Sequence, residues 1–385
     1  MSLFDANTEI YRRRGGLPAE EVDAAIERKQ EYEELKTALQ QTVAEGEEIS
    51  FVVGPEGSGK TTLVRRGLDE IGDRENFTTI IIDCASAETL YRTLVRTVNE
   101  FRSDENTLSE TGYTFDRVRM TLETEIASRA EPTVLVFDSI DALDSVDALG
   151  ELARQNNTGV VGIADDAKMA DQLGGDAWPA HSVVGFHQYT MAELRSLLEE
   201  WTETSLSNQP IAPEVIPLCA AYGSERDGDA QYALQLLREG TAIASNERAD
   251  RVRGRHIQSA KESTERVEIE ERISKLDTQS RLVLYSLLEL GAGGELPVRT
   301  ARVYEEYSST LSSTAGLETE PRSKRRIQER LNRLIDTELV EYTAHNEGRG
   351  NGAYREYDLA RDREILRSVL ADKLQAGSPS VSGLF

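Results

Sequence analysis

Short apolar runs separated by longer amphipathic stretches predict an alternation of strands and helices in the first half of the chain. Residues 18–43 place Val22, Ile26, Leu35 and Leu39 near helical spacing. Four apolar runs follow and predict buried strands: "ISFVVG" (49–54), "TTIIIDCA" (78–85), "TVLVFD" (133–138) and "TGVVGIA" (158–164). This alternation predicts a mainly parallel sheet with helices on both faces.

The pattern changes after Tyr189. From there to about Arg266 it is helical throughout, with breaks at 207–213 and 222–229, which predicts a small helical lid. The third region has helical patterns at 279–290 and 322–336. Two strand-like runs (339–345 and 353–359) flank the glycine-rich turn "NEGRGNG". Helices followed by a hairpin of this kind predict a winged helix-turn-helix.

Composition adds a strongly acidic surface. The formal net charge is −25, from 69 acidic and 44 basic residues, and only eight of the basic residues are lysine. Acidic excess with scarce lysine is what we expect of a protein from a very salty cytoplasm; an acidic mesophilic protein is the alternative. Because salt screens net charge, a local basic face has to decide whether the protein binds DNA.

The remaining compositional signals concern location. Cys84 lies in an apolar run and Cys219 in a helical stretch, and their wide separation favours buried thiols over a disulfide or a metal site. The four histidines show no metal-ligand spacing. No apolar run approaches the roughly 18 residues of a membrane span. We therefore expect a soluble cytoplasmic protein with no membrane partner.

The strongest motif is a phosphate-binding loop. "GPEGSGKTT" satisfies the spacing G-x-x-x-x-G-K-T, with an apolar strand before it and a helix after it. Glycines let backbone N–H groups curl around phosphates, Lys60 neutralises the β and γ oxygens, and the Thr61 hydroxyl ligates Mg²⁺. The alternative is a glycine-rich turn beside a chance Lys-Thr pair. The predicted nucleotide-binding residues are Gly54, Pro55, Glu56, Gly57, Ser58, Gly59, Lys60, Thr61 and Thr62.

A strand-end carboxylate completes this prediction. Asp138 ends the run "TVLVFD", where a carboxylate on the Mg²⁺ side of the nucleotide is expected; a solvated strand-end carboxylate is the alternative. A hydrolase of this build usually has a glutamate next, which handles the attacking water, and here the residue is Ser139. The metal ligands predicted are therefore Thr61 and Asp138.

Taken together, the phosphate loop, the lid segment "DGDAQYALQLLREG", the segment "FHQYTMAELRSLLEEW" and the winged region make the chain resemble a known family. It is similar to the archaeal initiators related to the eukaryotic origin recognition complex and its helicase-loading partner, which are AAA+ proteins. The resemblance implies binding of ATP or ADP with Mg²⁺, nucleotide contact by Tyr189, and binding of double-stranded origin repeats. It also implies work with the MCM replicative helicase and related initiator subunits.

The fold class that follows is an α/β P-loop (AAA+) parallel sheet with a helical lid and a C-terminal winged helix-turn-helix domain. The expected divisions are a flexible arm (1–20), the AAA+ nucleotide-binding domain (21–187), the helical lid (188–267), the winged-helix DNA-binding domain (268–374) and a disordered tail (375–385).

Several positions lack the residues that support ATP hydrolysis in the family. Asp165 stands where an asparagine usually helps to place water, and Gln231 and Trp201 stand where arginines are usual. No arginine occurs between Gln155 and Leu194, the stretch where a finger acting on a neighbour's nucleotide is expected. Such a finger is worth ~10³ to 10⁵ in rate. Together with Ser139, these departures predict nucleotide binding with slow or absent turnover.

The DNA-binding prediction rests on a local cluster of cations in "PRSKRRIQERLNRLID" (321–336). Apolar residues at 327, 331, 334 and 335 keep one face for the core, so cations can face a DNA groove; a solvated basic face is the alternative. The wing adds two arginines. The predicted DNA-binding residues are Arg322, Lys324, Arg325, Arg326, Arg330, Arg333, Arg349 and Arg355.

Three functions remain open at this point. The first is a DNA-binding initiator that holds its nucleotide, the second is the same fold with active turnover, and the third is a nucleotide-gated transcription regulator or a transposition or plasmid-type AAA+ ATPase. The segment 109–126, with Arg117 and Arg119, is either a second DNA contact or an ordinary amphipathic helix.

Overall fold

The computed structural model describes residues 28–45, 49–87, 89–102, 106–165, 181–205, 210–313, 323–346 and 353–377. The chain divides into two compact units, which we call unit 1 (Met1–Ile257) and unit 2 (Gln258–Phe385). The predicted arm (1–20) and residues 378–385 of the predicted tail lie outside the described residues.

Unit 1 is built on a five-stranded parallel sheet with the order β2-β3-β4-β1-β5. Its strands are β1 (Ile49–Val53), β2 (Thr78–Asp83), β3 (Thr133–Asp138), β4 (Thr158–Ala164) and β5 (His181–Gly185). Every residue of β1 and β4 is buried, as expected for strands covered on both faces. The prediction of a mainly parallel sheet from four apolar runs is confirmed.

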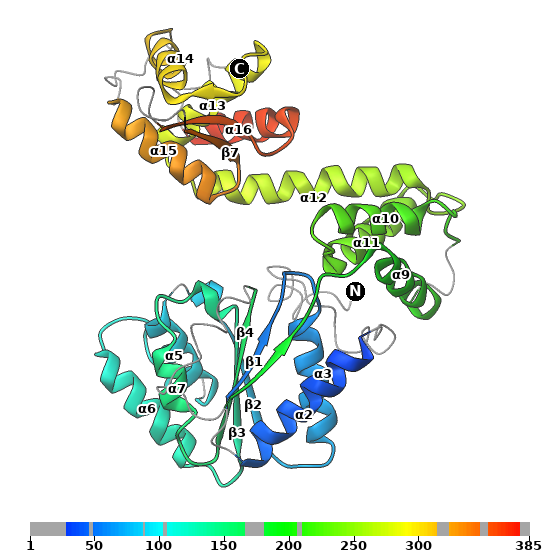
Figure 1. The fold of residues 1–385 in the computed structure, drawn as a ribbon, viewed down its shortest axis with the longest axis vertical. Helices are drawn as coiled ribbons and strands as arrows, with labels where there is room; N and C mark the ends of the chain where they lie inside the picture. The colour runs from blue at the N-terminus through cyan, green and yellow to red at the C-terminus, as the bar shows by residue number, and fades with distance from the viewer. Residues whose placement is uncertain are drawn as a thin grey trace. The chain divides into compact units, whose positions relative to one another are not determined.

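Helices cover both faces of this sheet (Figure 1). On one face, α2 (Lys29–Glu45) and α3 (Lys60–Gly72) pack with sheet residues such as Val52 and Val136. On the other, α5 (Leu90–Glu100), α6 (Phe115–Ala127) and α7 (Asp147–Leu152) pack with Phe51 and Phe137. Successive strand residues therefore serve opposite cores, which is why the apolar runs are nearly continuous. The short α4 (Cys84–Ala87) and η3 (Ile140–Ala142) follow β2 and β3.

The sequence did not predict β5. This edge strand pairs in parallel with β1, in the register Ile49↔His181 to Val53↔Gly185. Its sequence "HSVVG" has only two apolar residues, so its local pattern is too weak to stand apart from a turn. Phe186 and Tyr189 follow the carboxyl end of β5, so this strand determines where Tyr189, a predicted nucleotide contact, lies.

The predicted helical lid is confirmed as α9 (Met191–Ser205), α10 (Val215–Glu225), α11 (Ala230–Asn246) and the start of α12 (Gly254–Ser274). Asp229 caps α11, because its side chain accepts a hydrogen bond from the Tyr232 N–H. Cys84 and Cys219 are both free and buried, as predicted.

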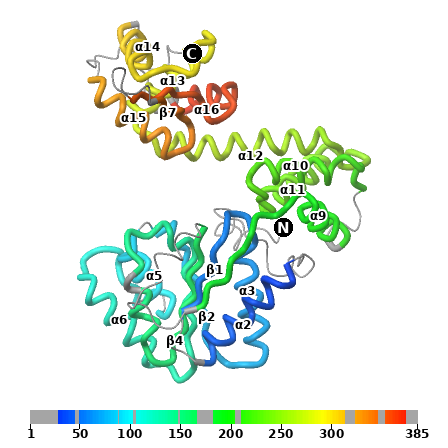
Figure 2. The backbone as a smooth tube through the Cα atoms, viewed as in Figure 1, coloured from blue at the N-terminus to red at the C-terminus, as the bar shows by residue number. Residues whose placement is uncertain are grey.

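Unit 2 contains a winged helix-turn-helix, as predicted. After α12 come α13 (Thr278–Ala292), β6 (Val298–Arg299), α14 (Thr300–Ser313), α15 (Lys324–Asp336), β7 (Val340–Asn346), β8 (Ala353–Leu359) and α16 (Arg363–Gly377). The helices α13, α15 and α16 gather around the antiparallel β7–β8 hairpin (Figure 2). The sequence missed α14, β6 and α16, and α16 continues past residue 374, where the predicted tail begins.

Candidate nucleotide site and nucleic-acid interface

The phosphate loop adopts a backbone that glycine permits. It joins β1 to α3, and Gly57 and Gly59 have φ angles of 72° and 88°, in the left-handed region. Gly59 precedes α3 without a side-chain cap, so the amino end of α3 presents backbone N–H groups to the loop. A helix N-terminus of this kind favours an anion.

Lys60 lies at the centre of the loop. Its side chain is only 6% exposed, and its Nζ donates to the carbonyl oxygens of Gly54 and Pro55, each at 2.7 Å. The third partner is the Asp165 carboxylate, with Oδ1 at 2.9 Å from Nζ. The ammonium group is therefore held at the loop from three sides.

Thr61 and Asp138, the two residues predicted as Mg²⁺ ligands, lie next to each other in the structure. The Thr61 hydroxyl donates to Oδ2 of Asp138 at 3.0 Å. Burial raises the pKa of Asp138, the neighbouring carboxylates Asp83 and Asp165 raise this pKa further, and the Thr61 hydrogen bond and the Lys60 charge lower it. A hydroxyl beside a carboxylate is a donor set that suits Mg²⁺. The described residues contain no group of three or more His, Cys, Asp or Glu side chains that could hold a metal ion. Phosphate oxygens and waters would complete the coordination of Mg²⁺ here.

Ser58 provides an independent indication of a phosphate ligand. Its side chain is 1% exposed, and its Oγ has no hydrogen-bond partner among the described residues. Buried hydroxyls normally have a partner. A phosphate oxygen in the loop would satisfy this one, so the residues present fit a bound nucleotide.

The lid closes directly on the phosphate loop. The Ala230 N–H donates to the Gly57 carbonyl at 3.3 Å, and a Cβ at Gly57 would lie only 1.9 Å from Oδ1 of Asp229. Similarly, a Cβ at Gly228 would lie 2.3 Å from the Tyr189 carbonyl. The amino end of α11 can approach the loop this closely only because Gly57 lacks a side chain, and it can approach Tyr189 only because Gly228 lacks one.

Tyr189 lies next to a residue that the sequence did not single out. The Arg28 guanidinium lies 3.8 Å from the centre of the Tyr189 ring and donates to the His187 carbonyl. Arg28 is 3% exposed, and a Cβ at Gly59 would lie 3.3 Å from the Tyr189 hydroxyl. Arg28 lies in a polar run without a motif, and its contact with His187 spans 159 residues of sequence, so no local signal could have found it.

Four positions depart from the family pattern, and none of them has a positively charged side chain: Ser139, Asp165, Trp201 and Gln231. Ser139 has a left-handed backbone (φ 57°) directly after β3. Gln231 is exposed in the first turn of α11, and Trp201 is buried in α9. Asp165, after β4, faces Lys60.

In unit 2, α15 separates into a buried and a charged face. Ile327, Leu331 and Leu334 are buried, while Lys324, Arg325 and Arg326 are exposed. Arg330 and Arg333 both form ion pairs with Asp277, and the Arg330 side chain is only 27% exposed. The structure thus divides the predicted cations of α15 into an exposed group at its amino end, in which Arg325 pairs with Glu329 at 3.3 Å, and a pair that Asp277 neutralises. Arg322 and Arg349 lie outside the described residues.

A hollow of about 530 Å³ is lined by α15, by the wing strand β8 and by residues 299–301. Arg355 stands on its wall, donates to Oδ1 of Asn332 at 3.2 Å and lies 4.2 Å from the centre of the Tyr342 ring. On the same wall Arg299 lies 3.5 Å from the Tyr354 ring centre. Arginines and polar side chains therefore line the space between the helix and the wing.

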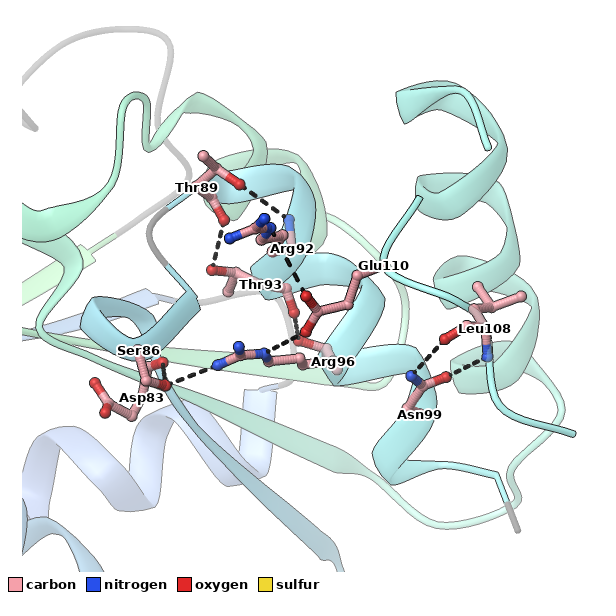
Figure 3. Close-up of polar contacts among 10 residues, drawn as sticks. Asp83, Ser86, Thr89, Arg92, Thr93, Arg96, Asn99, Leu108 and Glu110 are labelled. Carbon is pink, nitrogen blue, oxygen red and sulfur yellow. Dashed lines mark hydrogen bonds and ion pairs between the residues drawn. The ribbon is translucent and has the colours of Figure 1, made fainter. Parts of the chain in front are cut away.

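The second candidate DNA contact is partly engaged within the protein. Arg119 of α6 forms ion pairs with Glu151 at 2.9 Å and Glu123 at 3.4 Å. The preceding loop is tied to α5, where Arg92 and Arg96 both reach Glu110 and Asn99 exchanges two hydrogen bonds with the Leu108 backbone (Figure 3). A DNA contact by residues 109–126 stays a prediction.

Comparisons with known proteins agree with this architecture. Residues 25–163 match the AAA ATPase domain, residues 195–262 the Cdc6 AAA+ ATPase-type lid domain, and residues 271–369 the CDC6 C-terminal winged helix domain. The fold and site thus define the class of AAA+ ATPase-type proteins with a C-terminal winged helix.

Individual relatives specify the family. The chain is 31% identical over 378 residues to ORC1-type DNA replication protein 2 of Haloarcula marismortui, covering 93% of this chain and 90% of the relative. It is 32% identical over 318 residues to the ORC1-type DNA replication protein of Thermococcus kodakarensis, covering 78% and 75%. The Aeropyrum pernix ORC1 protein, solved in complex with DNA, matches with a TM-score of 0.79 at 27% identity over 93% of this chain and 94% of that one. The chain belongs to the family of ORC1-type DNA replication proteins, as the resemblance implied.

None of the helices in the described parts of the chain is long and apolar enough to span a membrane.

Proposed function

We propose that this chain is a replication initiator that binds ATP or ADP with Mg²⁺ in unit 1 and double-stranded origin repeats through unit 2, with slow or absent hydrolysis. The convergence of Lys60, Thr61 and Asp138 on a glycine loop carries the nucleotide part. Membership in the ORC1-type family and the cationic end of α15 support the DNA part.

The residues of the candidate site have distinct roles in this proposal. Lys60 binds β and γ phosphate oxygens, the Ser58 hydroxyl and the loop N–H groups bind further phosphate oxygens, and Thr61 and Asp138 hold Mg²⁺. Tyr189, with Arg28 stacked on its ring, borders the site next to the lid. Mg²⁺, when bound, neutralises phosphate charge and orients the phosphates.

Slow hydrolysis follows from what surrounds the phosphates. Fast phosphoryl transfer needs an oriented water and positive charge on the transition state. Ser139 has no carboxylate, Gln231 is exposed and Asp165 is paired with Lys60. A steady-state turnover assay, with Asp138→Ala as the blank, tests this part. Activity well above the blank would favour an active ATPase.

The DNA interface in this proposal is the exposed amino end of α15 together with the β7–β8 wing. Lys324, Arg325 and Arg326 would contact phosphates or base edges, and Arg355 would follow from the wing. Fluorescence anisotropy with an origin duplex tests it. Arg325→Ala with Arg326→Ala should weaken binding and flatten its salt dependence.

Arg266→Ala is the matched control for this measurement, because Arg266 pairs with Asp372 on α16 and lies in neither α15 nor the wing. Equal affinities for the double variant and the wild type would refute the interface. A genome-wide map of the DNA sites that the protein occupies then distinguishes an origin function from a promoter or transposon function. Co-precipitation from cells tests the MCM replicative helicase and related initiator subunits as partners.

A further inference from the structure

Asp165 forms an ion pair with Lys60 of the phosphate loop. Asp165 follows the carboxyl end of β4, and its Oδ1 lies 2.9 Å from the Lys60 Nζ. Its backbone N–H donates to Oδ1 of Asp141 at 2.9 Å, so the backbone of this residue is held in place. The side chain is 45% exposed, whereas that of Lys60 is 6% exposed. The carboxylate therefore covers the ammonium group from the open side.

In this contact Asp165 occupies a hydrogen-bonding position of the Lys60 ammonium that a phosphate oxygen would otherwise take. In a loop of this spacing the lysine binds oxygens of the β and γ phosphates. The Lys60 ammonium has three protons to donate, and in this structure its partners are two loop carbonyls and Asp165. A triphosphate must displace Asp165 or share the ammonium with it. A diphosphate needs only one ammonium proton for its β phosphate, so it can take the place of one loop carbonyl and leave the ion pair with Asp165 in position.

The surrounding charges increase this difference. Asp138 and Asp83 end the adjacent strands β3 and β2 in register, and the electrostatic interaction of Asp138 with Asp165 is unfavourable. A third phosphate would bring further negative charge to this edge of the sheet, and like charges at close range repel strongly where water is scarce. On the lid, Gln231 supplies no compensating charge.

We infer that Asp165 is a specificity-determining residue that makes the site prefer a nucleoside diphosphate to the corresponding triphosphate. This inference rests on the proposed nucleotide site and specifies the form of nucleotide that the site retains. Asp165 acts as an acceptor built into the chain, which competes with the terminal phosphate of a triphosphate for Lys60.

The test is calorimetric titration of the full-length, nucleotide-free protein with Mg²⁺-ADP and with the Mg²⁺ complex of a non-hydrolysable ATP analogue. The wild type should bind ADP about tenfold or more tightly than the analogue. Asp165→Asn keeps the size of the side chain and removes its charge, so analogue affinity should rise about tenfold and ADP affinity should change by less than about threefold.

Two further variants make the result specific. Asp69→Asn makes the same change of charge at an exposed position of α3, and should leave the ADP-to-analogue ratio at its wild-type value. Asp165→Ser is a second, smaller replacement in case the asparagine variant does not fold. The ratio is the decisive quantity, since a residue that only supports the loop would change both affinities by the same factor.

The possible outcomes are distinct. A wild-type ratio near one, or a ratio that Asp165→Asn leaves unchanged, overturns the inference while nucleotide binding stands. Failure of the folded wild type to bind either nucleotide overturns the proposed nucleotide function itself. A shift of the ratio towards the triphosphate in each Asp165 variant that folds, and not in Asp69→Asn, supports the inference.

Discussion

At the scale of single residues, Ser58 offers the most direct measure of phosphate contact. Its hydroxyl is buried without a partner among the described residues, and a buried, unsatisfied polar group costs ~1–3 kcal/mol. Ser58→Ala should therefore raise the free energy of unfolding of the nucleotide-free protein by about 1 kcal/mol. The same change should weaken ADP binding about tenfold, because a hydrogen bond to a charged group is lost.

Urea unfolding with and without ADP measures both effects. Ser274→Ala is the control, since it removes an exposed hydroxyl on α12 that donates to the Glu270 carbonyl, far along the chain from the loop. A Ser58→Ala protein that is less stable without ADP and binds ADP normally would show that the hydroxyl has a structural role only.

The residues of the candidate site that the sequence indicated are those linked by local spacing. Gly54, Gly59, Lys60 and Thr61 belong to one loop, and Asp138 was recognisable because a carboxylate ends an apolar run. Arg28 and Asp229 were not assigned to the site. Arg28 reaches the site from the amino end of α2, and Asp229 reaches it from the lid. Both contacts join residues far apart in the sequence, so the local sequence pattern does not predict them.

At the scale of elements, an ion-pair network joins α2 to α3 through Glu70. Lys36 on α2 donates to Oε2 of Glu70 at 2.6 Å, and Arg66 on α3 donates to Oε1 at 3.0 Å. The hydrogen bond from Lys36, with those from Arg66 and Tyr32, lowers the pKa of Glu70 from 4.5 to about 2. The ionised form is thus favoured in the folded state.

The sign of the pH dependence follows. A carboxyl with a lowered pKa stabilises the fold above its unfolded pKa, near 4.5, and this stabilisation is lost as the pH falls towards about 2. Glu70→Gln should cost about 1 kcal/mol at pH 7, because the side chain is 34% exposed and screening limits the interaction. The difference from wild type should shrink below pH ~4.

Thermal unfolding across this pH range measures the effect. Glu33→Gln, an exposed position of α2, serves as the control. A difference between Glu70→Gln and wild type that stays constant down to pH ~3 would contradict the role of the ion pairs.

Asp277 links α13 to the proposed DNA-binding helix. It accepts a hydrogen bond from the Ser280 N–H at 2.8 Å as the cap of α13, and it pairs with Arg330 and Arg333. Asp277→Ser keeps a capping oxygen and releases both arginines. DNA binding should become about tenfold tighter at low salt, and the salt slope steeper by about one to two.

Anisotropy titrations at several salt concentrations measure this. Asp362→Ser is a matched control, because Asp362 caps the start of α16 in the same unit and pairs with no arginine among the described residues. Equal DNA affinities for the two variants would mean that Arg330 and Arg333 do not reach DNA once they are released.

Elements with strong periodic patterns were predicted and weak ones were not. The strands β1 to β4 and the hairpin β7–β8 stand out as runs of apolar or alternating residues bounded by turns. By contrast, β5 has only two apolar residues, β6 has only two residues in all, and α14 is rich in serine, threonine and charged residues that resemble a loop. Tertiary contacts decide these elements: Val298 of β6 and Val303 of α14 belong to the core of unit 2.

At the scale of the whole molecule, net charge sets the response to salt. A net charge of −25 makes the folded chain repel itself, and added salt screens that repulsion. The partly exposed ion pairs also weaken in salt, but each is worth only ~0–1 kcal/mol. The melting temperature should therefore rise by several degrees between about 0.2 M and about 2 M KCl at pH 7.

The same salt series near the isoelectric point, about 4.7, is the control, because the net charge there is close to zero. The rise should be clearly smaller under that condition. A melting temperature that falls with KCl at pH 7 would show that ion pairs outweigh net repulsion.

The close approach of the lid to the phosphate loop has a mechanical consequence. Gly57 leaves no room for even a methyl group, since Asp229 occupies that space. Gly57→Ala would therefore push the amino end of α11 away from the loop. The side chains of Lys60, Thr61 and Asp138 are not altered by this substitution. A single methyl group at this position is thus enough to break the contact between the lid and the phosphate loop.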